Sequence, residues 1–501
     1  MAQTESNLNL QTGSAWQNPG SAAFDFRSDV VTRPTASMLE AIANTSLLDD
    51  DFMEDPTTNS LQEFVAKLAN QEDGLLVMSG TMGNQVAIRT HLTQPPYTVL
   101  CDHRAHIIHY EAGGVATWSS AYVKGIEPSN GRYLVLEDIQ KHAILNDDFH
   151  GCPTRVISLE NTLDGMILPL SEAKRICEWA HSHGLKVHLD GARLWEAVTA
   201  GAGSLPDYTA LFDSVSLCFS KGLGAPIGSI LVGSTEFIKK ARWFRKSIGG
   251  GTRQSGIITA AARVAVEETF GKGPRGEGGK LRASHENARR IADVWVQKGG
   301  KLACPTETNM VWFNLDAAGI STSDWEKLGQ REGLKLMGNR LVVHYHTKFD
   351  TVVKQTVSQL HNHLQNENNS GKAWRLTPRR IAEKAKFAQT SLVFAWDEMR
   401  WKRLLRVRRV TFPEPLSTPN HRYPALLLAS RASKTRPLTC ESISESQKTT
   451  AAAPRHSCVV VSSGTDQRAG GEVEVNGSGK AALSLVSAPI RHFKLLSPCK
   501  R

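Results

Sequence analysis

Val215-Ser216-Leu217-Cys218-Phe219-Ser220-Lys221-Gly222-Leu223-Gly224 is a short apolar run that ends in a serine–lysine pair followed by glycines. The run 215–219 has the length and composition of a buried strand. A lysine at the mouth of such a strand is costly unless its amine has a task, because an unpaired buried ammonium is poorly tolerated. A desolvated lysine can instead form a Schiff base with a carbonyl. The alternative is an ordinary surface lysine in the loop after the strand.

An acidic residue ends a second short strand, upstream of this lysine. The helix-like run 171–183 and a break at Gly184 lead into a strand at 185–190, which closes on Asp190. This succession is the repeating unit of α/β folds, in which ligand sites form at the carboxyl ends of strands. Alone, Asp190 is equally a strand-end cap. Together with Lys221 it indicates pyridoxal phosphate (PLP), whose ring nitrogen needs a carboxylate and whose aldehyde needs an amine.

Further segments extend this pattern along the chain. They are 26–32 (FRSDVVT), 54–59 (EDPTTN), 79–84 (SGTMGN), 105–107 (AHI), 110–114 (YEAGG), 159–162 (LENT), 188–193 (HLDGAR), 219–224 (FSKGLG) and 249–256 (GGGTRQSG). In this order they resemble the PLP-dependent low-specificity threonine aldolases of the aspartate aminotransferase superfamily. The resemblance covers residues 24–365 and implies cleavage of L-threonine or L-allo-threonine to glycine and an aldehyde. It also implies a homotetramer with active sites at subunit interfaces.

The resemblance implies an α/β enzyme of fold type I. We expect a large PLP-binding domain at 24–297, with a mostly parallel seven-stranded sheet between helices. A small α/β domain at 298–368 follows it. We expect residues 1–23 and the basic extension 369–501 to be disordered.

The resemblance also assigns the site residues. Lys221 holds the cofactor, His106 stacks on its ring, Asp190 faces the ring nitrogen and Arg193 contacts the phenolic oxygen. Strand 74–78, the turn after it and a helix at 85–92 form a phosphate cradle, to which we assign Gly80 and Thr81. Lys246 and Arg253 reach the phosphate region of a neighbouring subunit. Ser28, Arg193 and Arg340 bind substrate, with Arg340 on its carboxylate. Catalysis is assigned to Lys221, His106 and Asp190, and no metal is expected.

The chain departs from many bacterial members of the family after Thr162. Where they have histidine, this chain has Leu163-Asp164-Gly165, which removes a candidate proton carrier near the substrate hydroxyl. The acceptor of that proton is left open between His106 and a water. The nearest alternative function is an amino-acid racemase, since fungal alanine racemases resemble this family. A non-catalytic, nucleic-acid-binding protein is a more remote alternative that rests on the basic tail.

Charge is divided unevenly. Residues 371–501 carry 24 Lys and Arg against 9 Asp and Glu, a net of +15, which leaves −5 for residues 1–370 out of totals of 59 and 49. The eight cysteines lack metal-ligand or redox spacing. No long apolar segment, signal peptide or transit peptide is visible, so we expect a cytoplasmic enzyme of amino acid metabolism with no membrane or nucleic-acid partner.

The N-terminal segment and an acidic run after it each have a local pattern. Residues 24–31 read as a strand that leads into Pro34, with a helix at 37–44 capped by Thr35 or Ser37. The acidic run Asp49-Asp50-Asp51 fits no metal loop, so we expect a solvated loop there.

Overall fold

The computed structural model describes residues 14–146 and 148–347. The predicted disordered extension 369–501 lies outside these residues, as does most of the predicted disordered N-terminus. Residues Gly20–Phe24 form a short 3-10 helix, η1, in which Ala22 and Ala23 are buried. No described helix is long and apolar enough to cross a membrane. The cysteines of the described part form no disulfide.

A seven-stranded sheet is the centre of the fold. Its strands are β1 (Asp73–Val77), β2 (Thr98–Asp102), β3 (Tyr122–Ile126), β4 (Thr154–Glu160), β5 (Lys186–Gly191), β6 (Ser214–Cys218) and β7 (Ser229–Gly233). They are arranged in the order β1-β7-β6-β5-β4-β2-β3. Neighbours from β6 to β3 run parallel, and β7 is antiparallel to both β6 and β1. This arrangement confirms the predicted mostly parallel sheet.

Alternation along the strands produces three layers. Leu100 belongs to one large apolar cluster, whereas its neighbours Val99 and Cys101 belong to a second cluster on the opposite face. Leu231 likewise faces away from Ile230, which joins the large cluster. Because successive strand side chains point to opposite faces, a sheet that is apolar on both sides must be covered on both sides.

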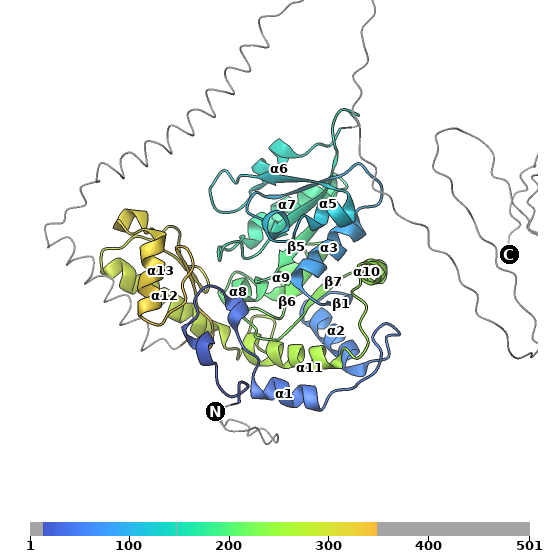
Figure 1. Ribbon diagram of the computed structural model, residues 1–501. Coiled ribbons are helices and arrows are strands. Elements are labelled where there is room, and N and C mark those ends of the chain that lie inside the picture. Colours follow the sequence, from blue (N-terminus) through green and yellow to red (C-terminus); the bar gives the residue numbers. More distant parts are fainter. Residues whose placement is uncertain (1–13, 147, 348–501) are drawn as a thin grey trace, which may run out of the picture. The chain divides into compact units, whose positions relative to one another are not determined.

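Helices supply the two outer layers (Figure 1). They are α1 (Ala36–Ala43), α2 (Pro56–Leu68), α3 (Gly80–His91), α4 (His106–His109), α5 (Gly114–Ser119), α6 (Leu136–His142), α7 (Leu170–Ser182), α8 (Leu194–Thr199), α9 (Leu205–Thr209), α10 (Thr235–Ser247) and α11 (Gly256–Ala265), with a π-helical turn, η3 (Val266–Phe270), after the last. Helices α3 and α10 pack against each other and the sheet, and α1 lies along α11. Thr35 caps α1, one of the two residues predicted for that role.

A second core lies under a small two-stranded sheet. Strands β8 (Met310–Trp312) and β9 (Arg340–Val342) pair antiparallel, and α13 (Thr322–Arg331) lies between them in the sequence. The cluster contains Trp325 and Phe313, together with Trp295 from α12 (Leu281–Gln297). Figure 1 shows α12 beside α13. Arg340, the predicted ligand of the substrate carboxylate, is the first residue of β9.

The predicted strand at 24–31 is wrong. Asp25 forms a single parallel bridge with Lys335, and the chain then turns into a 3-10 helix, η2 (Asp29–Val31). Ser28 caps this helix by accepting the amide of Val30. Asp29 is buried at the start of this 3-10 helix.

The expected solvated loop at 49–51 is also wrong. Asp50 is 1% exposed and pairs with the buried Arg245 of α10 at 2.8 Å. Asp51 contacts Lys246, and Asp49 lies 2.8 Å from Arg253. A buried charge is tolerated where it is paired and hydrogen-bonded, so this acidic run fastens the loop to the end of α10.

We predict that Asp50→Ala destabilises the protein by about 3 kcal/mol, because it removes the near counter-ion of the buried Arg245 guanidinium and leaves only Asp51, at 4.0 Å. Asp49→Ala is the matched control, since its partner Arg253 is 60% exposed, and it should cost much less. Urea unfolding of both variants measures the difference. Equal losses would contradict a special contribution from the buried pair.

Candidate active site

The predicted site residues meet at one edge of the sheet. The carboxyl ends of β2, β4, β5 and β6 lie at this edge, because these strands run parallel. Asp190 near the end of β5 is the register partner of Glu160 at the end of β4. Lys221 follows the end of β6 after a short turn. The edge therefore collects an amine and several carboxylates from separate segments.

Lys221 is half-buried and held by its backbone. Its carbonyl accepts hydrogen bonds from the Thr32 hydroxyl at 2.7 Å and from the Gly224 amide at 3.0 Å. Gly224 has φ +86°, a conformation that favours glycine, so the glycine of the motif closes this turn. Within the described chain the amine makes no hydrogen bond or ion pair. The positive charge of Lys221 favours a lower pKa for the nearby Asp29 and Glu160 carboxyls.

Asp190 is buried and accepts two hydrogen bonds. Asn84 Nδ2 donates to its Oδ2 at 2.7 Å, and the Ala192 amide donates to its Oδ1 at 3.0 Å. Burial and the neighbouring Asp190 charge raise the pKa of the Glu160 carboxyl well above its usual range. Two adjacent buried carboxyls disfavour each other's charged form, which adds to the effect of burial on Glu160.

Arg193 makes a two-pronged ion pair with Asp29. Its Nε and Nη2 donate to the two Asp29 oxygens at 2.8 and 2.6 Å. Burial alone would raise the pKa of Asp29, but the Arg193 charge and hydrogen bonds lower it to about 2. Ser28 Oγ lies 3.5 Å from the same carboxylate. Asp29 lies in the motif 26–32, but no role was predicted for it from the sequence. An acidic residue inside that motif was the signal that could have indicated one.

His106 lies against a second carboxylate that the sequence reading missed. Its Nδ1 is 2.8 Å from Glu111 Oε1, and its amide donates to Glu160 Oε2 at 3.0 Å. Glu111 is buried, and Asn84 bridges it to Asp190 by donating to both. His106, Glu111 and Asp190 offer ligand atoms close enough to hold a cation. The Asn84 amide donates to both carboxylates, and the expectation of no metal stays a prediction.

Arg340 reaches the site from β9 without a carboxylate partner in the described residues. One guanidinium nitrogen donates to the Arg27 carbonyl at 3.1 Å, and the group lies 5.7 Å from the Trp312 ring. Burial lowers its pKa, and so does the neighbouring Arg193 charge. Arg193 pairs with the Asp29 carboxylate and Arg340 has no such partner among the described residues, so the two guanidinium groups carry an excess positive charge that suits an anion.

Gly80 and Thr81 form the first turn of α3 rather than the predicted turn before it. Ser79 caps the helix by accepting the Met82 amide at 3.1 Å. The first amides of a helix have no partner within the helix, so this end favours an anion. The Ser229 hydroxyl, buried without a partner in the described residues, lies beside Gly80. Free donors here, a free amine at 221 and the Asp190 carboxylate together suit a phosphate-bearing pyridine aldehyde.

Lys246 and Arg253 are not brought to this edge. Both side chains are about three-fifths exposed and pair with the acidic run Asp49–Asp51. Leu163 is buried, and the Asp164 carboxylate lies 3.9 Å from Arg104. The role predicted for Lys246 and Arg253 concerns a second subunit and stays a prediction.

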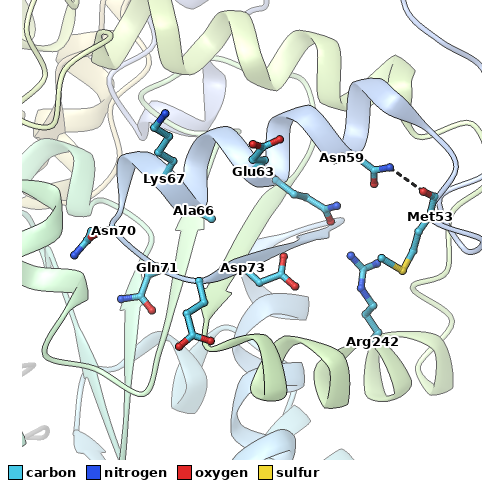
Figure 2. Close-up of a pocket in the computed structure, with 11 residues that line it drawn as sticks. Met53, Asn59, Glu63, Ala66, Lys67, Asn70, Gln71, Asp73 and Arg242 are labelled. Carbon is cyan, nitrogen blue, oxygen red and sulfur yellow. Dashed lines mark hydrogen bonds between the residues drawn. The ribbon is translucent and has the colours of Figure 1, made fainter.

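A hollow of about 510 Å³ lies elsewhere on the molecule, between α2 and α10 (Figure 2). Its lining includes Lys67, Asp73 and Arg242. Asp73 is the first residue of β1, at the opposite end of that strand from Ser79. The hollow contains none of the predicted site residues.

Comparison with known proteins places the chain in a family. The model of the beta-eliminating lyase family matches residues 25–318. The chain is 55% identical over 345 residues to "Aldolase vrtJ" of Penicillium aethiopicum, covering 69% of this chain and 87% of that protein. It is 47% identical to the low specificity L-threonine aldolase of Saccharomyces cerevisiae (66% and 84% covered) and to "Alanine racemase TOXG" of Cochliobolus carbonum (66% and 85% covered).

Solved structures give the same fold. The Leishmania major threonine aldolase superposes with a TM-score of 0.57 at 19% identity, covering 68% of this chain and 99% of that one. A threonine aldolase-like protein from Exiguobacterium superposes with a TM-score of 0.54 at 21% identity, covering 68% and 96%. The match over more than half of the chain, with a fold type I sheet and a lysine at its carboxyl edge, shows that this chain belongs to the beta-eliminating lyase family, among relatives that include the low-specificity threonine aldolases.

Proposed function

We propose that this chain is a PLP-dependent aldehyde-lyase that cleaves β-hydroxy amino acids, L-threonine and L-allo-threonine among them, to glycine and an aldehyde. The observation that carries the proposal is the Lys221 amine, which pairs with no other residue in the described part of the chain, at the sheet edge that also bears Asp190. Relatives named as threonine aldolases at 41–47% identity support the reaction type. When bound, PLP supplies a carbonyl for an amine and a ring that takes up an electron pair.

The chain's own residues divide the work. The amine of Lys221 would hold the cofactor until substrate arrives, and the Asp190 carboxylate would keep a ring nitrogen protonated. Amides at Gly80 and Thr81 would bind the phosphate. Arg340 would bind the substrate carboxylate and so fix the orientation of the scissile bond. Asp29 would keep the Arg193 guanidinium in place.

The reaction is tested with purified protein, PLP and four substrates: L-threonine, L-allo-threonine, phenylserine and L-alanine. We expect aldehyde and glycine from the three hydroxylated substrates. Lys221→Ala, the control, should release none. Because one relative is named an alanine racemase, D-alanine is measured in the same assay. D-alanine formation without any aldehyde would overturn the aldolase in favour of the racemase, which breaks the Cα–H bond instead.

Substitutions of Asp190 and Arg340 should change different kinetic constants. Asp190→Asn should lower kcat by several powers of ten, each of which corresponds to about 1.4 kcal/mol, because the ring could no longer be held protonated. Arg340→Ala should raise KM about 10- to 100-fold with a smaller change in kcat, because a charged hydrogen bond is lost in ground and transition states alike. Steady-state aldehyde release measures both. An unchanged KM in Arg340→Ala would remove Arg340 from the site.

We further propose a homotetramer that completes each site with Lys246 and Arg253 of a neighbour. Large apolar side chains support an interface near these residues, since Leu47, Phe52 and Trp243 are 59%, 72% and 74% exposed. Light scattering should give four times the chain mass, and Phe52→Asp should reduce it. A wild-type protein that is monomeric and fully active would contradict the shared site.

A further inference from the structure

Glu111 is a buried carboxylate with an amide donor on each oxygen. Its side chain is fully buried, Asn84 Nδ2 donates to its Oε1 at 2.8 Å and Gln85 Nε2 donates to its Oε2. His106 Nδ1 lies 2.8 Å from Oε1. Amide donors on both oxygens suit a carboxyl group that acts as an acceptor. Ala112 and Gly113 have φ of +51° and +71°, so the chain turns sharply directly after Glu111.

Asn84 cannot be turned around without placing its oxygen against two carboxylates. Its amide nitrogen donates to Glu111 and Asp190, which leaves Oδ1 for His188 Nε2 at 3.1 Å. Burial lowers the pKa of His188 to about 4, so this imidazole is neutral and gives its one N–H to Asn84. Its Nδ1 then accepts from the Ser214 hydroxyl at 2.9 Å. This chain of bonds holds Glu111 as an acceptor.

The Glu111 carboxylate determines which tautomer His106 adopts. A carboxylate that only accepts requires a proton on Nδ1 of the imidazole that faces it. A neutral imidazole carries one N–H, so Nε2 keeps a free lone pair. In the described part of the chain Nε2 has no hydrogen-bond partner, and the ring is about one-third exposed. His106 is therefore equipped to accept a proton at Nε2.

We propose that Glu111 is the positioning residue that fixes His106 in its Nδ1–H form, so that Nε2 takes the β-hydroxyl proton of the substrate. The inference rests on the proposed aldolase function. The hydroxyl O–H bond breaks as Nε2–H forms, and the oxygen pair becomes the carbonyl of the aldehyde. The Cα–Cβ bond breaks with its electron pair left on Cα, which takes up one proton to give glycine. Ionised Glu111 then faces an imidazolium, which stabilises the charge.

Two other groups near the site serve this purpose less well. Leu163, at the place where the family resemblance puts a histidine in many bacterial members, offers no proton acceptor. Glu160 lies beside Asp190, but burial raises the pKa of its carboxyl, so near neutral pH it already holds a proton. Of these three side chains, His106 is the one that offers a lone pair at the exposed side of its ring.

Glu111→Gln tests the proposal, with Gln85→Met as the matched control, because Gln85 bonds Glu111 on its other oxygen and does not touch His106. Nitrogen-15 spectra of labelled histidines, assigned with His106→Phe, report the tautomer. We expect Nδ1–H in wild type and in Gln85→Met, and a mixture or Nε2–H in Glu111→Gln. Aldehyde release should fall about 100-fold in Glu111→Gln. Exchange of the glycine Cα proton with deuterium, which needs no hydroxyl acceptor, should change little.

A double-mutant cycle completes the test. His106→Phe should reproduce the selective loss, and adding Glu111→Gln to it should cost nothing further, because both changes remove one function. Equal slowing of aldehyde release and glycine exchange by Glu111→Gln would overturn the proposal, as would a selective loss in Glu160→Gln or an Nε2–H form in wild type. If Glu111→Gln does not fold, the tautomer of His106 in the wild-type protein still tests the proposal. If wild type releases no aldehyde, the proposed function fails, while the tautomer is measured independently.

Discussion

Burial of negative charge at the carboxyl edge of the sheet is the constraint on which this molecule depends. Asp29, Glu111 and Asp190 are each at most 4% exposed. A carboxylate in such surroundings is tolerated only with donors aimed at it, and each of these receives them from a distant segment. Arg193 serves Asp29, and the Asn84 amide serves the other two. Assembling the charges therefore ties the N-terminal segment, α3 and the strand ends together.

The parts of this arrangement that obey local rules could be predicted from the sequence. Strand ends and the turn after β6 are decided by short runs of residues, so the places of Asp190 and Lys221 at the carboxyl ends of β5 and β6 were predicted, whereas α3 begins at Gly80, earlier than the predicted helix at 85–92. Asp29 was missed as a functional residue because residues 24–31 read as an extended strand. The 3-10 turn there follows from pairing with Arg193, which is 164 residues away.

Glu111 and Asn84 show a second limit. Asn84 contacts Glu111, which is 27 positions away in the chain, and Asp190, which is 106 positions away. The orientation of the Asn84 amide decides which atom donates and which accepts in each hydrogen bond. Periodicity carries no such information. A solvated loop was expected for the acidic run 49–51 because its spacing fits no metal loop. Basic groups on α10 and after it pair with this run, and only the packed structure brings them near.

The relatives include enzymes named for two different bond cleavages, and the site indicates where these diverge. An aldolase must take a proton from a hydroxyl on the β-carbon, whereas a racemase takes one from Cα. In the proposed function, Lys221, Asp190 and the α3 end would serve either reaction, since each would hold the cofactor. The Glu111–His106 pair concerns the side of the substrate where an aldolase differs.

A crystal structure of the protein with PLP and glycine tests this account most directly. The account predicts the phosphate at the amides of Gly80 and Thr81, the ring nitrogen against Asp190, and the glycine carboxylate on Arg340. It also predicts the His106–Glu111 hydrogen bond intact beside the ring. A phosphate bound away from α3, or a cofactor joined to a lysine other than Lys221, would contradict it.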